Sequence, residues 1–162
     1  MTWLTRVFFA LVMLAIIQVG YYYPQMPVTV ASHFDGLGAA NAWSGKNGFF
    51  GLYLAIVLML VGVFVWVPAW SEKRANFGLK IPHAEHWLAP ERIAETRRFF
   101  RHQMMLMGIV HLLLAICVTQ LAIVANFDEQ PRLHDSIYWA LGLYFLILIA
   151  WLIHFFLHFR NP

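Results

Sequence analysis

The chain has 162 residues, of which 61% are apolar and only 12% are charged, and its formal net charge is +3. Soluble domains carry roughly twice this charged fraction, so the composition excludes an ordinary soluble globular protein. The basic residues flank apolar segments. They therefore indicate membrane topology, and no nucleic-acid partner is expected.

The apolar residues fall into four blocks, residues 4–22, 49–70, 104–124 and 137–159. Each block has about the length of roughly 20 residues that an α-helix needs to cross a bilayer. The blocks are continuous and do not alternate as the strands of a membrane barrel do. The sequence therefore predicts an all-α integral membrane protein with four transmembrane helices, forming a single membrane domain over residues 1–162.

The first block has a cleaved signal peptide as its alternative interpretation. It ends in three tyrosines followed by Pro24, whereas a cleavage site needs small residues. Tyrosine is typical of the membrane–water interface. We therefore expect the first block to be a retained helix.

The segment after the first block predicts a short β-hairpin on the outer side. Residues 28–34 include β-branched residues in partial alternation, Asp35-Gly36 is a turn dipeptide, and residues 39–43 would form the return strand. Ser44 or Asn47 is then expected to cap the second helix.

Orientation follows from the basic residues, because seven of the eleven lie between residues 71 and 103. These seven are Lys73, Arg74, Lys80, Arg92, Arg97, Arg98 and Arg101. Arg6 and Arg160 flank the termini on the same side, and only Lys46 and Arg132 lie on the other. The positive-inside rule therefore predicts a bacterial cytoplasmic (inner) membrane protein with both termini in the cytoplasm.

The middle segment also predicts how the third helix begins. Pro90 suits the first turn of a helix, which would either run directly into the membrane or bend at the interface. Arg97, Arg98 and Arg101 would then lie at the level of the lipid headgroups, where anionic lipids attract them.

The outer histidines raise a metal hypothesis. His33 and Asp35 are two residues apart and would share one face of a strand. A later acidic loop supplies further donors, namely Asp128, Glu129, His134 and Asp135. Imidazole and carboxylate groups suit a divalent metal, but no tight metal-binding motif is present. The interpretation that we favour is a turn role for Asp35 and a bond from His33 to the loop backbone, so no cofactor is predicted.

A second histidine group lies within the apolar blocks. His154 and His158 would share one helix face, and His111 is predicted at about the depth of His154, some 10 Å inside the third block. Ionisable residues inside a membrane are costly and are candidates for function. The structural alternative is a hydrogen bond between neutral His111 and His154. Gln18, Thr119 and Gln120 are expected to form hydrogen bonds between helices.

One stretch, residues 23–46, resembles a known family. The matching positions are Pro24, Pro27, Ser32, His33, Phe34, Gly38, Trp43, Ser44 and Lys46, and Trp87, Pro90, Arg92 and Thr96 follow in the middle segment. The pattern is similar to a bacterial membrane-domain family of unknown function found at the N-terminus of SdpI-type immunity proteins, which protect against a sporulation-delaying toxin. The resemblance implies a membrane domain with an outer His-Phe loop.

Three functional hypotheses are open. The leading one is recognition of a peptide, a lipid or a membrane-protein complex through the outer loop, by His33, Phe34, Asp35, Trp43 and Lys46. The second is metal binding or small-solute transport by His111, His154 and His158, with a divalent metal. The third is an accessory subunit of a respiratory or photosynthetic complex. The sequence contains no nucleophile elbow, phosphate-binding loop or dinucleotide motif, so no enzymatic activity is expected.

Overall fold

The computed structural model describes residues 2–71 and 81–160, which are mostly helical. In chain order the elements are α1 (Trp3–Tyr22), β1 (Thr29–Phe34), β2 (Ala40–Gly45), α2 (Lys46–Val61), the π-helical turn η1 (Gly62–Trp66), α3 (Val67–Ser71), α4 (Ala84–Trp87), α5 (Ile93–Ala125) and α6 (Ser136–Arg160). Four helical segments are long and apolar enough to span a membrane, namely α1, α2 through α3, α5 and α6. This confirms the four predicted blocks.

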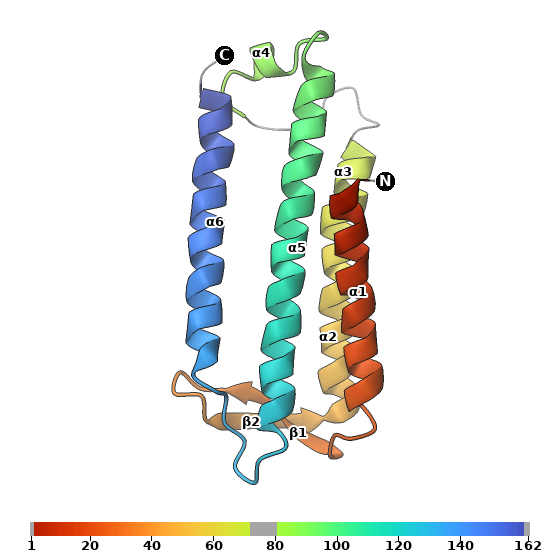
Figure 1. Cartoon of the computed structure of the whole chain (residues 1–162), viewed down its shortest axis with the longest axis vertical. Coiled ribbons are helices and arrows are strands. Elements are labelled where there is room, and N and C mark those ends of the chain that lie inside the picture. Colours follow the sequence, from red (N-terminus) through yellow and green to blue (C-terminus); the bar gives the residue numbers. More distant parts are fainter. Residues whose placement is uncertain (1, 72–80, 161–162) are drawn as a thin grey trace.

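The long helices run side by side, and the connections gather at two ends (Figure 1). The β-hairpin and the α5–α6 connection lie at one end, which we call the hairpin end. The two termini and α4 lie at the other, which we call the terminal end. The basic residues Lys73, Arg74 and Lys80 lie outside the described residues.

The predicted hairpin is present, with β1 and β2 paired antiparallel and an irregular register around His33. The expectation that Ser44 or Asn47 caps the following helix is wrong. Gly45 occupies the capping position without a side-chain hydrogen bond. The physical reason is that β2 leads directly into α2, which leaves Asn47 inside the first turn, where its Oδ1 accepts from the Tyr23 hydroxyl at 2.7 Å.

Helix α5 is the central element of the bundle. Its 33 residues correspond to about 50 Å, well beyond the roughly 30 Å of a hydrocarbon core. It begins at Ile93, close to the predicted start near Pro90, and continues into the apolar block as one helix. Arg97, Arg98 and Arg101 therefore lie on the part of α5 nearest the terminal end.

The core lies between α1, α5 and the helix formed by α2 and η1. Phe8 and Leu112 are fully buried there, beside Phe64 of η1. Gly108 makes this close packing possible, because a Cβ atom at this position would lie 2.8 Å from Phe8 and 2.9 Å from the Cβ of Phe64. The π-helical turn ends just before Pro68, which has no N–H to donate to the helix ladder.

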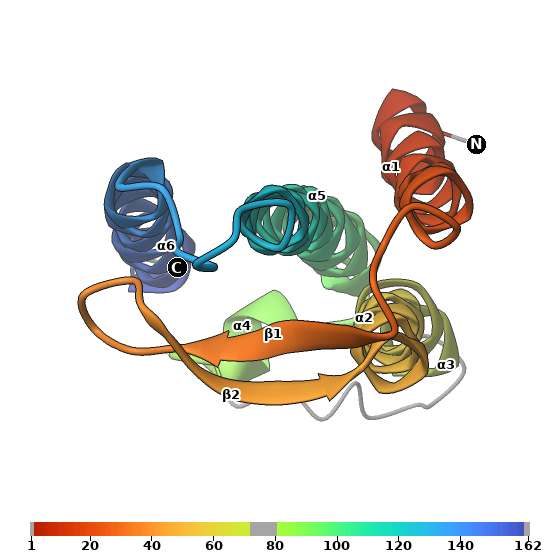
Figure 2. The ribbon, with the colours of Figure 1, turned by 90° about the horizontal axis from the view of Figure 1, so that it is seen from below.

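Helix α6 stands apart from this core and packs mainly against α5 (Figure 2). None of its most apolar stretch is buried within the protein. Two side-chain hydrogen bonds join it to α5: Trp151 Nε1 donates to Gln103 at 2.8 Å, and Tyr144 and His111 are 3.0 Å apart. The fold is therefore a three-helix core with a fourth helix attached through α5.

Candidate functional site

The turn of the hairpin is fixed by Asp35. Its carboxylate accepts hydrogen bonds from the backbone N–H groups of Leu37 and Ala39, at 2.8 and 2.9 Å. This confirms the interpretation of Asp35 as a turn residue. Gly38 completes the turn with φ +80°, a conformation that side chains disfavour, and a Cβ there would lie 3.0 Å from the carbonyl oxygen of Leu133.

Three hydrogen bonds attach this turn to α6 and to the segment that leads into it. Leu133 donates its N–H to the Gly38 carbonyl at 2.8 Å, and Ala40 donates to the carbonyl of Pro131 at 3.2 Å. The Tyr138 hydroxyl donates to the Gly36 carbonyl at 2.9 Å. The hairpin thus crosses the end of the bundle from α2 to α6 (Figure 2).

The middle of β1 is held by Asn126, which follows the last residue of α5. Its Oδ1 accepts from the N–H of Ala31 at 2.6 Å, and its Nδ2 donates to the Ala31 carbonyl at 3.0 Å. The same Nδ2 donates to the Ala122 carbonyl at 2.8 Å. Because Ala31 is fully buried, Asn126 satisfies backbone groups that water does not reach.

Lys46 stabilises the end of the hairpin that adjoins α2. Its ammonium donates to the carbonyls of Tyr23 and Met26, at 3.2 and 3.3 Å, and lies 4.7 Å from the centre of the Tyr23 ring. Lys46 therefore joins the α1–β1 connection to the start of α2. Its ammonium group is engaged by two hydrogen bonds and a cation–π contact.

Below the hairpin, a groove of about 800 Å³ runs between α2 and α5. Its walls are mainly apolar, and its residues are Ser32, His33, Phe34, Ser44, Gly48, Phe49, Leu52, Tyr53, Ile56, Met59, Leu60, His111, Leu114, Ala115, Val118, Thr119, Ala122 and Leu133. Leu52 and Met59 are 65% and 57% exposed, so the groove is open on the outer surface of the bundle.

The predicted outer-loop residues divide around this groove. His33 and Phe34 line it, whereas Asp35, Trp43 and Lys46 do not. The Nδ1 of His33 lies 2.6 Å from Oδ1 of Asn41 and donates to it, which corrects the expected bond to the loop backbone. Within the described residues, Nε2 of His33 makes no hydrogen bond. Trp43 is 54% exposed.

His111 contributes a polar group at the end of the groove farthest from the hairpin. Its Nδ1 donates to the Met107 carbonyl at 2.7 Å, and its Nε2 lies within hydrogen-bond distance of the Tyr144 hydroxyl, at 3.0 Å. Both ring nitrogens are satisfied, so this pair joins α5 to α6.

The expectation that His111 lies level with His154 is wrong. His154 follows Tyr144, the partner of His111, by about 15 Å along α6 at 1.5 Å per residue. The expected depth of His111 is counted from residue 104, the start of the third apolar block. Helix α5 begins earlier, at Ile93, so each residue of α5 pairs with a residue nearer the start of α6 than this count implies.

His154 and His158 lie instead at the terminal end, among aromatic rings. His158 stacks on Phe99 with the ring centres 3.7 Å apart, and Trp87 lies 5.3 Å away from it. The ring of His154 lies 6.2 Å from that of Phe99. The three histidines of the transport hypothesis therefore do not form one site.

A buried polar network lies beside the groove. Gln18 donates to Oε1 of Gln120 at 2.8 Å and accepts from the Tyr53 hydroxyl at 2.7 Å. Gln120 in turn donates to the hydroxyl of Tyr22 at 2.9 Å. The expected interhelical bonds of Gln18 and Gln120 are confirmed, and the network ties α1, α2 and α5 together. Thr119 lines the groove and, within the described residues, makes no such bond.

The metal hypothesis finds no cluster to support it in residues 2–71 and 81–160. No three His, Cys, Asp or Glu side chains gather there in a way that could hold an ion. Asp35 is engaged by the turn, and Nδ1 of His134 lies 3.0 Å from the hydroxyl of Ser136.

Residues 8–60 match a domain family described as a domain of unknown function, DUF1648. The match takes in most of α1, the hairpin and most of α2. It agrees with the part of the resemblance that names a domain of unknown function. No curated protein and no solved structure matches the chain.

Sequence reasoning missed three residues that shape the site, namely Asn126, Tyr144 and Tyr53. Asn126 was read only as the start of a loop, and the two tyrosines as parts of apolar blocks. A polar residue directly after a long apolar helix is a signal for Asn126. The partner of Tyr144 depends on the helix register, which no local pattern carries.

Proposed function

We propose that this chain is a non-enzymatic membrane protein that binds the apolar segment of a membrane-active peptide in the groove between α2 and α5. The observation that carries the proposal is the groove itself, about 800 Å³ with apolar walls and the polar hairpin at one end. This volume lies within the roughly 300–1,000 Å³ typical of ligand sites.

The lining favours a peptide over an acyl chain. Gly48, Ala115 and Ala122 line the groove, and small residues allow the backbone of another helix to approach closely in a membrane. At the hairpin end, Nε2 of His33 and the hydroxyls of Ser32 and Ser44 are suited to pair with the backbone groups left unsatisfied at a helix terminus.

The resemblance of residues 23–46 to SdpI-type immunity proteins supports the same class of ligand. A protein that sequesters a membrane-active peptide would protect the cell that makes it. The basic residues support an orientation in an inner membrane with both termini in the cytoplasm. In this orientation the hairpin faces outward, where an arriving peptide first meets the groove.

Photo-cross-linking in living cells tests the proposal. A benzophenone amino acid replaces Leu52 in the groove or Leu58 outside it, two leucines of α2 that are 65% and 68% exposed. The probe is the cell's own secreted peptide fraction or a synthetic amphipathic Leu/Lys helix. We expect a peptide adduct at position 52 and none at position 58. The adduct at position 52 should disappear when Ala115→Trp fills the groove. Lipid adducts alone at both positions would overturn the proposal.

An accessory-subunit role is a second candidate, and the exposed surface of α6 favours it. None of the apolar stretch of α6 is buried within the protein, and Trp139 and Leu146 on it are 83% and 67% exposed. Purification in mild detergent distinguishes the two. A stable larger complex that dissociates when α6 carries the substitution Leu146→Lys would favour the accessory role. Purification of the chain as a lone species would exclude this role.

A further inference from the structure

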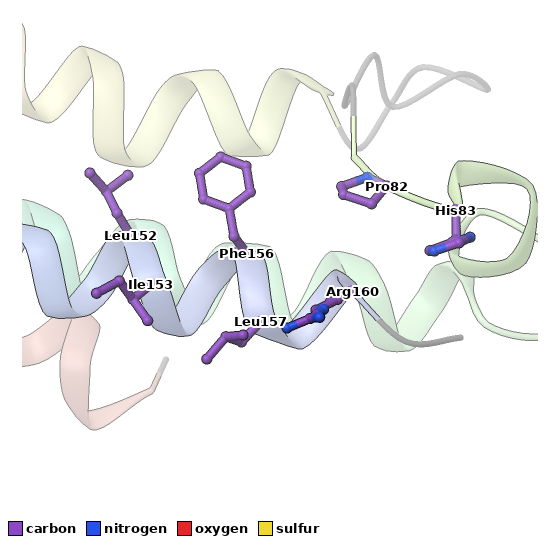
Figure 3. Close-up of a pocket in the computed structure, with 7 residues that line it drawn as sticks. All are labelled: Pro82, His83, Leu152, Ile153, Phe156, Leu157 and Arg160. Atoms are coloured by element: carbon purple, nitrogen blue, oxygen red, sulfur yellow. The ribbon is translucent and has the colours of Figure 1, made fainter.

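A second hollow, of about 540 Å³, lies at the terminal end beside α6 (Figure 3). Its lining residues are Pro82, His83, Leu152, Ile153, Phe156, Leu157 and Arg160. Five of these come from α6, while Pro82 and His83 come from the segment that precedes α4. This hollow is separate from the groove below the hairpin and shares no lining residue with it.

The α6 side of the hollow is an apolar channel. Leu152, Ile153, Phe156 and Leu157 repeat at helical spacing and are between 40% and 57% exposed. They point away from α5, which is contacted instead by Trp151 and Phe155. An acyl chain lying along α6 would cover these four side chains.

The polar end of the channel carries basic side chains. Arg160 and His83 lie at this end, beyond the apolar residues (Figure 3). Within residues 2–71 and 81–160, neither side chain has a hydrogen bond or an ion pair. A guanidinium offers donors that match a phosphate, and it lies here at the end of a helix long enough to span a membrane.

We propose that this hollow binds one anionic phospholipid, with an acyl chain along Leu152, Phe156 and Leu157 and its phosphate at Arg160. Charge complementarity selects this occupant. The described part of the terminal end also carries Arg92, Arg97, Arg98 and Arg101, and the cytoplasmic leaflet of a cell membrane is anionic. His83 supplies a second donor to the headgroup. The site is independent of the peptide proposal.

Native mass spectrometry of the whole chain in detergent tests the site with phosphatidylglycerol and phosphatidylcholine as probes. We expect Arg160→Gln to weaken phosphatidylglycerol binding about fivefold, the contribution of one cation near a membrane surface. Arg132→Gln removes the same charge from an exposed position at the hairpin end and serves as the control. It should leave binding unchanged, and Arg160→Lys should retain most of it.

The apolar channel has its own matched pair. Phe156→Ala removes a ring that is 57% exposed in the channel, and Phe145→Ala removes one that is 54% exposed elsewhere on α6. Only Phe156→Ala should weaken lipid binding. Glycerol phosphate, the headgroup chemistry without chains, should not compete. Equal losses for Arg160→Gln and Arg132→Gln, equal binding of phosphatidylcholine, or competition by glycerol phosphate would each overturn the proposal.

Discussion

Asn126 fixes the hairpin to the bundle through its side-chain amide, although no sequence motif singles this residue out. The strand it holds is short, and a two-stranded hairpin is marginally stable by itself. Both polar groups of Ala31 depend on Asn126, and Ala31 is fully buried. The position of His33 above the groove therefore depends on a residue distant in sequence.

We expect Asn126→Ala to lower the free energy of unfolding by about 2–4 kcal/mol, because two buried backbone groups lose their partners. Unfolding in mixed micelles measures the loss, and hydrogen exchange should show faster exchange confined to residues 29–45. Asn47→Ala removes an exposed hydrogen bond to Tyr23 and should cost less than about 1 kcal/mol. Equal losses in the two variants would contradict the role of Asn126.

The resemblance at residues 23–46 points to the hairpin loop, and the residues inside this loop have different structural roles. Asp35 forms the turn, Lys46 bonds to backbone carbonyls, and His33 and Phe34 line the groove. The residue types in the loop were sufficient to predict the hairpin and its turn. They were insufficient to separate lining residues from supporting ones, since that depends on where α5 and the α5–α6 connection lie.

At the scale of elements, α5 organises the bundle because α1, the α2–η1 helix and α6 all pack on it. Its contact with α1 and η1 passes through Gly108, where two aromatic side chains meet the helix backbone. Its contact with α6 passes through His111 and Gln103. The groove exists because α2 and α6 lie on different sides of α5.

Gly108→Ala should destabilise the bundle by about 1–3 kcal/mol, because the added methyl overlaps Phe8 and the Cβ of Phe64. Thermal unfolding of the purified chain in detergent measures the effect. Gly142→Ala on α6 is the matched control, since nothing lies within 4 Å of its Cβ position. It should be neutral or raise stability by up to about 1 kcal/mol through helix propensity. Similar melting temperatures for both variants would refute this packing.

At the scale of the whole molecule, the two ends differ in chemistry. The hairpin end carries the β-hairpin and one opening to the groove. The terminal end carries most of the arginines of the described chain and the proposed lipid site. If the positive-inside rule holds, each end faces the compartment that suits its proposed ligand.

Cysteine labelling tests this orientation. In a Cys117→Ser background, Leu37→Cys in the 74% exposed hairpin turn should react with a membrane-impermeant maleimide in intact spheroplasts. Glu91→Cys, an exposed position at the terminal end, should react only after the membrane is permeabilised. The reverse pattern would place the hairpin in the cytoplasm and would remove the basis for peptide capture from outside.

The sequence by itself determined the four helices, the hairpin and the early start of α5, because these follow from continuous hydropathy, β-branched residues around a turn dipeptide, and Pro90. Only the tertiary structure decided that His111 pairs with Tyr144 and not His154, that Asn126 holds the hairpin, and that a groove opens between α2 and α5. The physical reason is that hydropathy and turn patterns are local. Helix register and side-chain pairing depend on residues far apart in the sequence, such as Ala31 and Asn126, which are 95 positions apart.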